Sequence, residues 1–271
     1  MSYIHGTAPD EQRRLALMND LINAGSLREL ALEAGDRVLD LGSGTGQLAR
    51  AMARAAGPSG RVVGVESSRE QLMSARRLAD LADEAGLVDF REGDAAAPPL
   101  RDDEWGTFDV VHTRFLLEHL PDPASVVRAL VRAARPGGRI VLEDDDHDLL
   151  RLWPEPAGIA AVWSAYQDVY RNNGCDPLIG RKLPGLLHDA GAFASRSTWV
   201  FFGACAGNVA FGSAVANLHA ILTGARDAIL ATGAVEAAAF DRSLEALNRW
   251  GSLPGASFGY AIAWAEGLKP A

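Results

Sequence analysis

Five short strand-like segments alternate with helix-like segments between residues 37 and 143, and this alternation constrains the fold more than any other feature. The strand-like segments are residues 37–41, 61–65, 88–92, 108–113 and 139–143. Residues 47–56, 69–85 and 124–135 lie between them and are predicted as helices, because glycine or proline follows each one. The early apolar segments are continuous runs rather than alternating ones, so we predict strands buried on both faces of a parallel sheet. Short strand–helix–strand connections then predict a Rossmann-like, doubly wound α/β sheet.

Charge and composition narrow the classes of function. The 271 residues carry a formal net charge of −9 and no cluster of five basic residues, so nucleic acid is a poor default substrate. Cys175 and Cys205 match no zinc-ligand spacing, and the first residues lack the apolar core of a signal peptide, so we expect a cytoplasmic protein with reduced thiols. Residues 199–222 carry no charged side chain. Their glycines, asparagines and histidine make them too polar for a membrane span, so we predict a buried strand and helix there.

A glycine-rich turn follows the first predicted strand, where residues 38–46 read VLDLGSGTG. Glycines let the chain bend tightly and let a ligand approach the main chain, and the next helix offers free N–H groups to an anion. Dinucleotide-binding folds use G-x-G-x-x-G, whereas this turn is G-x-G-x-G with Asp40 two residues before it. The segment resembles the first motif of the class I S-adenosylmethionine-dependent methyltransferase family. That resemblance implies that Asp40, Gly42, Gly44 and Gly46 hold the methionine part of the cofactor.

Acids at the ends of the next two strands fit the same resemblance. Glu66 stands about 20 residues beyond the turn, which suits hydrogen bonding to two ribose hydroxyls. The alternative for Glu66 is an exposed acid at a strand end. Asp94 and Ala95 follow the third strand, where the family uses an acid for the adenine amino group and the next N–H for a ring nitrogen. A solvated loop aspartate is the alternative for Asp94.

Two later segments are also similar to the family. Residues 108–120 read FDVVHTRFLLEHL and resemble its fourth-strand segment, and residues 134–138 read ARPGG and resemble its turn before the fifth strand. In the first segment His112 and Thr113 are expected under the methionine end of the cofactor. Arg114 is expected to anchor an anion or to pair with an acid.

The resemblance covers roughly residues 36–146 and completes the expected architecture. We expect an α/β, Rossmann-like sheet of about seven strands, whose last pair includes an antiparallel strand, with a helical cap. The expected parts are a helical lid over residues 1–35, a cofactor-binding core over 36–146, and completion of the sheet with cap helices over 147–271, all in a single folded domain. Within the last part we predict helices at 159–172, 180–190 and most of 209–250, and strands at 198–202 and 257–265.

The cofactor-binding residues that the resemblance implies lie on several predicted strand ends and in the lid. They are Tyr3, Asp40, Gly42, Ser43, Gly44, Gly46, Glu66, Ser67, Asp94, Ala95, Thr113 and Arg114. Tyr3 belongs to a short segment that the family often folds over the cofactor, and a disordered tail is the alternative for it. No metal is expected.

Candidates for a general base are few, and a base is needed only if the attacking atom must lose a proton. His119 follows the fourth strand, and His147 stands beside the acidic run of residues 143–146. That run is first interpreted as a solvated loop, then as a site for a cationic or amine substrate, and last as a metal site, because adjacent carboxylates cannot all face one ion. Arg181 at a helix start is a candidate for an anionic group or a partner acid.

Three hypotheses follow. The leading one is an enzyme that transfers a methyl group from S-adenosylmethionine to an O, N or C atom of a small organic acceptor, leaving S-adenosylhomocysteine. An NAD-dependent oxidoreductase is disfavoured by the glycine spacing and by the lack of a Tyr-x-x-x-Lys pair. A cofactor-binding protein repurposed for other chemistry or for regulation would carry the same motifs. A small-molecule substrate is the expected partner, and a homodimer is left open.

Overall fold

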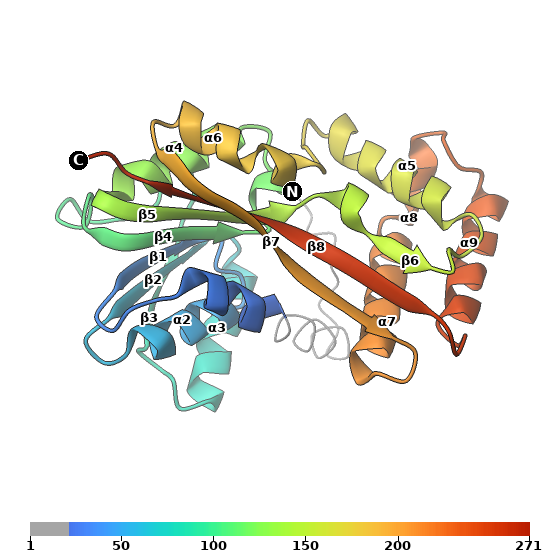
Figure 1. Cartoon of the computed structure of the whole chain (residues 1–271), viewed down its shortest axis with the longest axis horizontal. Helices are drawn as coiled ribbons and strands as arrows, with labels where there is room; N and C mark the ends of the chain where they lie inside the picture. The colour runs from blue at the N-terminus through green and yellow to red at the C-terminus, as the bar shows by residue number, and fades with distance from the viewer. Residues whose placement is uncertain (1–21) are drawn as a thin grey trace. The chain divides into compact units, whose positions relative to one another are not determined.

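The computed structural model describes residues 22–271, which divide into two compact units built from discontinuous segments (Figure 1). The core unit comprises residues 23–146, 178–200 and 262–271. The helical unit comprises residues 147–177 and 201–261 together with Ile22. Tyr3 and most of the expected lid lie outside the described residues, and the boundaries expected for the parts of a single domain stay a prediction.

The core unit is organised around a sheet with the strand order β3-β2-β1-β4-β5-β8. Its strands are β1 (Arg37–Leu41), β2 (Arg61–Glu66), β3 (Val88–Glu92), β4 (Phe108–Arg114), β5 (Ala134–Asp145) and residues 262–268 of β8 (Ser257–Leu268). The first five strands pair in parallel, and β8 runs antiparallel to β5. β7 (Phe193–Cys205) also pairs with β8. This topology confirms the predicted doubly wound α/β class and its late antiparallel strand.

Helices cover both faces of this sheet. In Figure 1, α2 (Gln47–Ala56) and α3 (Arg69–Leu81) lie on one side, and α4 (Pro123–Ala133) and α6 (Leu183–Asp189) lie on the other. α4 begins as its sequence predicts, because Asp122 accepts a hydrogen bond from the Ser125 N–H at 3.3 Å and a proline occupies the first turn. The face that α4 turns to the sheet is apolar.

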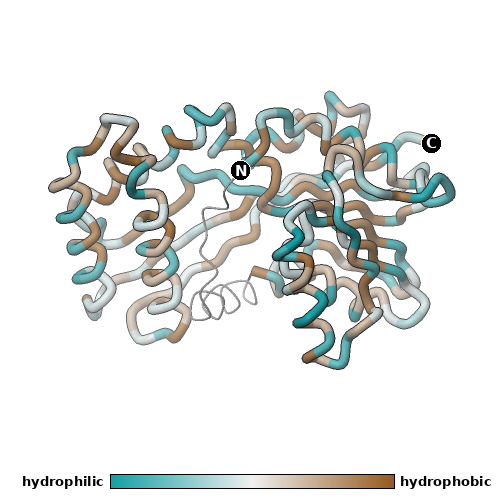
Figure 2. The backbone as a smooth tube through the Cα atoms, turned by 180° about the vertical axis from the view of Figure 1, so that it is seen from behind, coloured by the Kyte–Doolittle hydropathy of each residue, from teal (hydrophilic) through white to brown (hydrophobic). Residues whose placement is uncertain are grey.

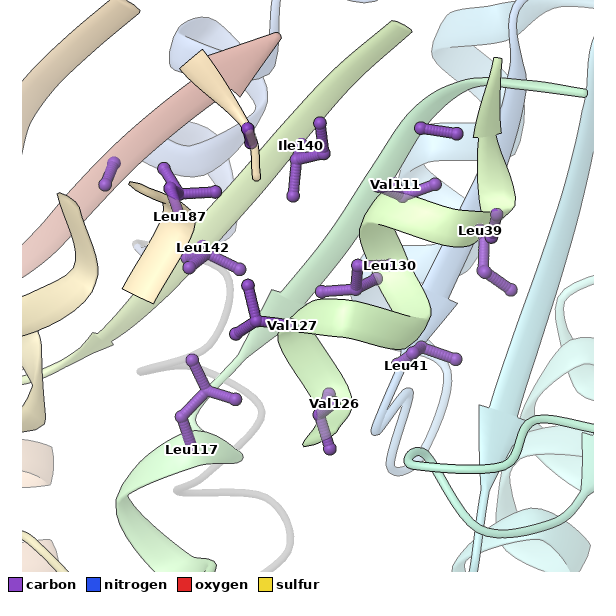
Figure 3. Packing of buried hydrophobic residues seen from close by; sticks show 14 of the residues in the cluster. Leu39, Leu41, Val111, Leu117, Val126, Val127, Leu130, Ile140, Leu142 and Leu187 are labelled. Carbon is purple, nitrogen blue, oxygen red and sulfur yellow. The ribbon is translucent and has the colours of Figure 1, made fainter. Parts of the chain in front are cut away.

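The core between α4, α6 and the sheet consists of aliphatic side chains. In Figure 3 the side chains of Val127 and Leu130 on α4 point toward the sheet residues Leu142 and Val111, and all four are fully buried. Figure 2 shows the strands of this unit mostly in the hydrophobic colour and many of the connecting loops in the hydrophilic one. Burial of this apolar surface stabilises the sheet, and one edge of that sheet carries the glycine turn.

The helical unit carries most of the remaining helices. They are α5 (Ile159–Asn172), α7 (Val209–Gly224), α8 (Arg226–Ala231) and α9 (Ala237–Trp250), and the unit also holds η2 (His147–Leu149) and β6 (Arg151–Trp153). β6 pairs with Ser257–Gly259 of β8 and was not among the predicted strands, because three residues are too few for a periodic pattern. Phe211, Phe240 and Trp250 are buried in the core of this unit. No helix within residues 22–271 is long and apolar enough to cross a membrane.

Candidate cofactor site

The glycine turn after β1 has a backbone that only glycine adopts readily. Gly42, Gly44 and Gly46 have φ angles of 78°, 54° and 71°, in the region that other residues rarely enter. At Gly46 a Cβ atom would lie 2.3 Å from Cζ of Phe90. The N–H groups of Gly42 and Ser43 both donate to the carbonyl of Val65, at 2.8 and 3.0 Å. The turn is therefore fixed against the end of β2.

The carboxylate of Glu66 reaches from the end of β2 into this turn. Its Oε2 accepts a hydrogen bond from the Gly44 N–H at 2.9 Å, and its Oε1 accepts one from the Ser68 N–H at 2.7 Å. Ser67 lies beside it, with Oγ 3.4 Å from the same Oε1. Glu66 is 8% exposed, so the alternative of an exposed acid at the strand end is wrong. The structure brings Glu66, Ser67 and Gly44 together as the resemblance implies.

Asp94 and Ala95 lie on the loop after β3, at the same edge of the sheet. Asp94 is exposed, and its Oδ1 accepts a hydrogen bond from the Ala96 N–H at 2.8 Å. Ala95 is half-buried. Asp94 therefore shapes its own loop, and its role toward an adenine ring stays a prediction.

His112 on β4 occupies the centre of the site and is completely buried. Its Nδ1 lies 2.8 Å from Oδ1 of Asp40 on β1, and its Nε2 lies 3.6 Å from Oε2 of Glu143 on β5. Burial disfavours the charged imidazole, but the two carboxylates outweigh that cost and raise the pKa of His112 above its ordinary value. The ends of three adjacent strands thus place one buried imidazole between two buried carboxylates.

Arg114 continues this polar group toward the helical segment 22–30. It donates from Nη1 to Ser26 Oγ at 3.0 Å and from Nη2 to Asn23 Oδ1 at 2.6 Å. Ser26 in turn donates to Oε1 of Glu143 at 2.7 Å. Arg114 thus donates its hydrogen bonds to neutral side chains. One expectation had been a direct ion pair with a carboxylate. Thr113, the residue before it, donates from Oγ1 to the carbonyl of Leu41 at 2.9 Å.

The acidic run of residues 143–146 is not the solvated loop that the sequence first suggested. Glu143, Asp144 and Asp146 are 0%, 0% and 2% exposed. Asp144 accepts from the N–H of Leu117 at 2.7 Å, and Asp146 holds Arg181 through two contacts of 2.6 Å. The interpretation as a solvated loop is wrong, because each of these acids has partners within the protein. Arg181 pairs with an acid, which was one of the two expectations for it.

The two candidate bases lie in different units. His119 belongs to η1 (Leu117–His119) in the core unit, with its side chain 35% exposed and Nε2 3.4 Å from Oε1 of Glu118. His147 is buried in the helical unit, where its ring stacks on Tyr166 at 5.8 Å and its carbonyl accepts from the Trp163 indole at 2.8 Å. No finding tests either histidine as a base, so both roles stay predictions.

A buried polar atom of the glycine turn fits a polar ligand there. Among the described residues of the turn, Ser43 Oγ is buried without a hydrogen-bond partner. The turn also offers main-chain N–H groups at the start of α2, as an anionic group requires. The chemistry of this donor and acceptor set suits an amino acid linked to a nucleoside.

Sequence reasoning missed Asn23, Ser26 and Glu143 as members of this group, and it gave His112 no acid partners. Register explains why. Asp40 pairs with His112, and His112 pairs with Val141, in the parallel ladders of β1, β4 and β5. Polar residues within apolar strand segments, at matching distances from the strand ends, are the one signal that could have indicated such a group.

Comparisons with known proteins agree with this architecture. Residues 39–142 match the family described as "Methyltransferase domain". The chain is 48% identical over 109 residues to the ubiquinone biosynthesis O-methyltransferase of Ralstonia nicotianae, and the aligned residues cover 40% of this chain and 42% of that protein. It is 37% identical over 157 residues to the 27-O-demethylrifamycin SV methyltransferase of Amycolatopsis mediterranei, covering 58% of this chain and 54% of that protein. The chain thus spans about half the length of the curated relatives it matches.

A solved structure resembles the fold over most of the chain. A methyltransferase-family protein of Bacillus halodurans C-125 superposes with a TM-score of 0.58 and 20% sequence identity, covering 92% of this chain and 99% of that one. At this identity the likeness concerns the fold alone. The fold class predicted from the sequence is therefore confirmed, and the match over residues 39–142 agrees with the predicted methyltransferase family. Within this chain, residues 39–142 match the family of methyltransferase domains.

Proposed function

We propose that this chain transfers a methyl group from S-adenosylmethionine to an O, N or C atom of a small organic acceptor. The observation that carries this proposal is the direct link between Glu66 and the glycine turn through the Gly44 N–H. That link sets a carboxylate for ribose hydroxyls beside a turn that opens to a carboxylate or amino group. When bound, S-adenosylmethionine supplies an electrophilic methyl group on a sulfonium.

The residues of the core unit have distinct tasks in this proposal. Glu66 orients the ribose, and its two bonds to main-chain N–H groups keep its carboxylate in place before the cofactor arrives. Gly42 and Gly44 leave room for the methionine part next to the main chain. Asp40 is held by His112, so that its carboxylate does not need to find its orientation during binding.

Calorimetric titration with S-adenosylmethionine, S-adenosylhomocysteine and NAD tests the cofactor. We expect both S-adenosyl compounds to bind and NAD to bind far more weakly. Tighter binding of NAD would overturn the proposal and favour the oxidoreductase alternative. Turnover is then followed as S-adenosylhomocysteine formed in the presence of an acceptor, which separates a methyltransferase from a protein that only binds the cofactor.

The acceptor is proposed to present an oxygen nucleophile. Both curated relatives described above carry names that assign methyl transfer to oxygen, one in ubiquinone biosynthesis and one on a demethylrifamycin. A panel of hydroxylated aromatic compounds, matched amines and carbon nucleophiles would rank the three acceptor atoms. Methylation of amines or of carbon nucleophiles, with none of the hydroxyl compounds, would contradict the assignment to oxygen.

His119 and His147 are the proposed candidates for a general base, if the acceptor hydroxyl must lose its proton in the reaction. Replacement of a true base by asparagine should lower kcat roughly 10²- to 10⁴-fold with little change in cofactor affinity. Equal kcat for His119→Asn, His147→Asn and the unchanged protein would remove both from the mechanism. The homodimer also stays a prediction, which analytical ultracentrifugation of the full chain would test.

A further inference from the structure

We propose that His112 is a positioning residue, which couples the cofactor turn to the helical segment 22–30 by bridging Asp40 and Glu143. Its effect on cofactor binding rests on the proposed function, whereas its effect on the helical segment does not. His112 touches no reacting atom in this proposal. It acts through the two carboxylates that it holds.

The bridge is a continuous series of contacts within the core unit. It begins at Asp40, two residues before Gly42, where the carboxylate meets His112 Nδ1 at 2.8 Å. On the other side of the ring, Nε2 faces Oε2 of Glu143 at 3.6 Å. Both carboxylates and the imidazole are at most 5% exposed as side chains. These three side chains therefore have little or no contact with bulk solvent.

From Glu143 the contacts continue into the helical segment. Oε1 of Glu143 accepts from Ser26 Oγ at 2.7 Å, and Ser26 is completely buried. Arg114 contacts the same hydroxyl and also Asn23, at 3.0 and 2.6 Å. Residues three apart on a helix share a face, so Asn23 and Ser26 present one polar face to Arg114. The position of the helical segment thus depends on how Glu143 is oriented.

The charges explain why a cation is needed at position 112. Asp40 from β1 and Glu143 from β5 face the imidazole, and Arg114 is the cation that interacts with both of these acids and with Asp145. With His112 charged, one histidine and one arginine balance Asp40 and Glu143. Without that charge two buried carboxylates share one arginine, and a buried charge without a partner is strongly destabilising.

This balance makes the coupling depend on pH, with a sign that follows from the raised pKa of His112. The folded protein holds the proton more tightly than the unfolded chain does, so the stabilisation is complete below the ordinary pKa of about 6.5. It is lost as the pH rises through the raised value. We therefore expect the helical segment to loosen, and the affinity for S-adenosylhomocysteine to fall, over that alkaline range.

The first experiment follows the imidazole and the helical segment in the cofactor-free protein. NMR titration of the imidazole should place His112 above the ordinary histidine range. Hydrogen–deuterium exchange of residues 22–30 should be at least about tenfold faster in His112→Asn, because one charge-assisted hydrogen bond is worth a factor of ten or more. His188→Asn, on the exposed face of α6, is the matched control and should exchange as the unchanged protein does.

The second experiment measures the affinity for S-adenosylhomocysteine across pH 5–9. We expect the affinity of the unchanged protein to fall at the alkaline end, and that of His112→Asn to be about tenfold weaker at pH 6 and to vary little with pH. An imidazole that titrates at or below the ordinary value overturns the proposal, as does unchanged exchange of residues 22–30. If His112→Asn does not fold, the NMR titration of the unchanged protein still decides. If the unchanged protein does not bind S-adenosylhomocysteine, the proposed function fails while the cofactor-free measurements still test the coupling.

Discussion

Glu66 has two tasks that a single substitution can separate, one in the empty turn and one in cofactor binding. In the structure its two carboxylate oxygens each accept one main-chain N–H, from Gly44 and from Ser68. Glu66→Gln keeps the shape of the side chain but leaves only one acceptor oxygen, so the amide nitrogen must face the other N–H. One charge-assisted hydrogen bond is then lost even when no cofactor is present.

The size of both effects follows from these contacts. A hydrogen bond to a charged group contributes about 1.5–3 kcal/mol, and Glu66 is 8% exposed, so water replaces little of it. For a domain of this size about 2 kcal/mol corresponds to a fall in Tm of roughly 4–8 °C. Loss of the charge toward the ribose hydroxyls should weaken S-adenosylhomocysteine binding by a further 10- to 150-fold or so.

Thermal unfolding by circular dichroism measures the first effect, and calorimetric titration of S-adenosylhomocysteine measures the second. Glu92→Gln is the matched control, because Glu92 pairs with Glu66 in the β2–β3 ladder and is exposed. It should change Tm by no more than about 1 °C, since its side chain is solvated. A Glu66→Gln variant that binds S-adenosylhomocysteine within threefold of the unchanged protein would refute the placement of the ribose at Glu66.

Three further predictions test the packing, the turn and the buried acids. Leu130→Ala should lower the free energy of unfolding in urea by about 2–5 kcal/mol because Leu130 is fully buried; Leu81→Ala, at a residue 78% exposed, should change it by less than about 0.5 kcal/mol. Gly46→Ala should lower the free energy of unfolding in urea by about 2–5 kcal/mol, because residue 46 has a φ of 71° and the added Cβ would overlap with Phe90. A crystal structure of the variant with an unmoved Phe90 ring would contradict this. Burial raises the pKa of Glu118 to about 8 from 4.5, so its protonated form is favoured in the fold, and stability should fall as the pH rises from about 4.5 to about 8. Urea unfolding at several pH values should show that fall in the unchanged protein and a smaller one in Glu118→Gln.

The parallel part of the sheet could be predicted from the sequence because its signals are local. The segment 37–41 and the helix 47–56 coincide with β1 and α2, and the strand 88–92 coincides with β3. Each is a short strand-like segment or a helix bounded by turn residues, and such patterns depend only on neighbours in the chain. Longer-range effects changed other bounds. β5 begins at Ala134 rather than at the predicted residue 139, because Ala134 already pairs with Phe108 of β4, before an irregularity that leaves residues 135–138 outside the β4 ladder.

The candidate site divides in the same way. Gly42, Gly44, Gly46 and Glu66 could be identified from residue types and spacing, since a tight turn needs glycine and a strand end presents its acid at a known edge. Their contact through the Gly44 N–H agrees with that prediction. The sequence also indicated the family correctly for residues 39–142.

Only the tertiary structure decided how the buried charges are paired. Asp40 and His112 are 72 residues apart in the chain, and Ser26 and Glu143 are 117 apart, so no local pattern connects them. The acids of residues 143–146 were first interpreted as solvated because charged side chains usually are. Their burial became favourable when β-sheet register and helix packing brought Ser26 and Arg181 within hydrogen-bond distance of them and His112 within 3.6 Å of Glu143. A buried carboxylate is stable only with such partners, and which partners it finds is a property of the fold rather than of the neighbouring sequence.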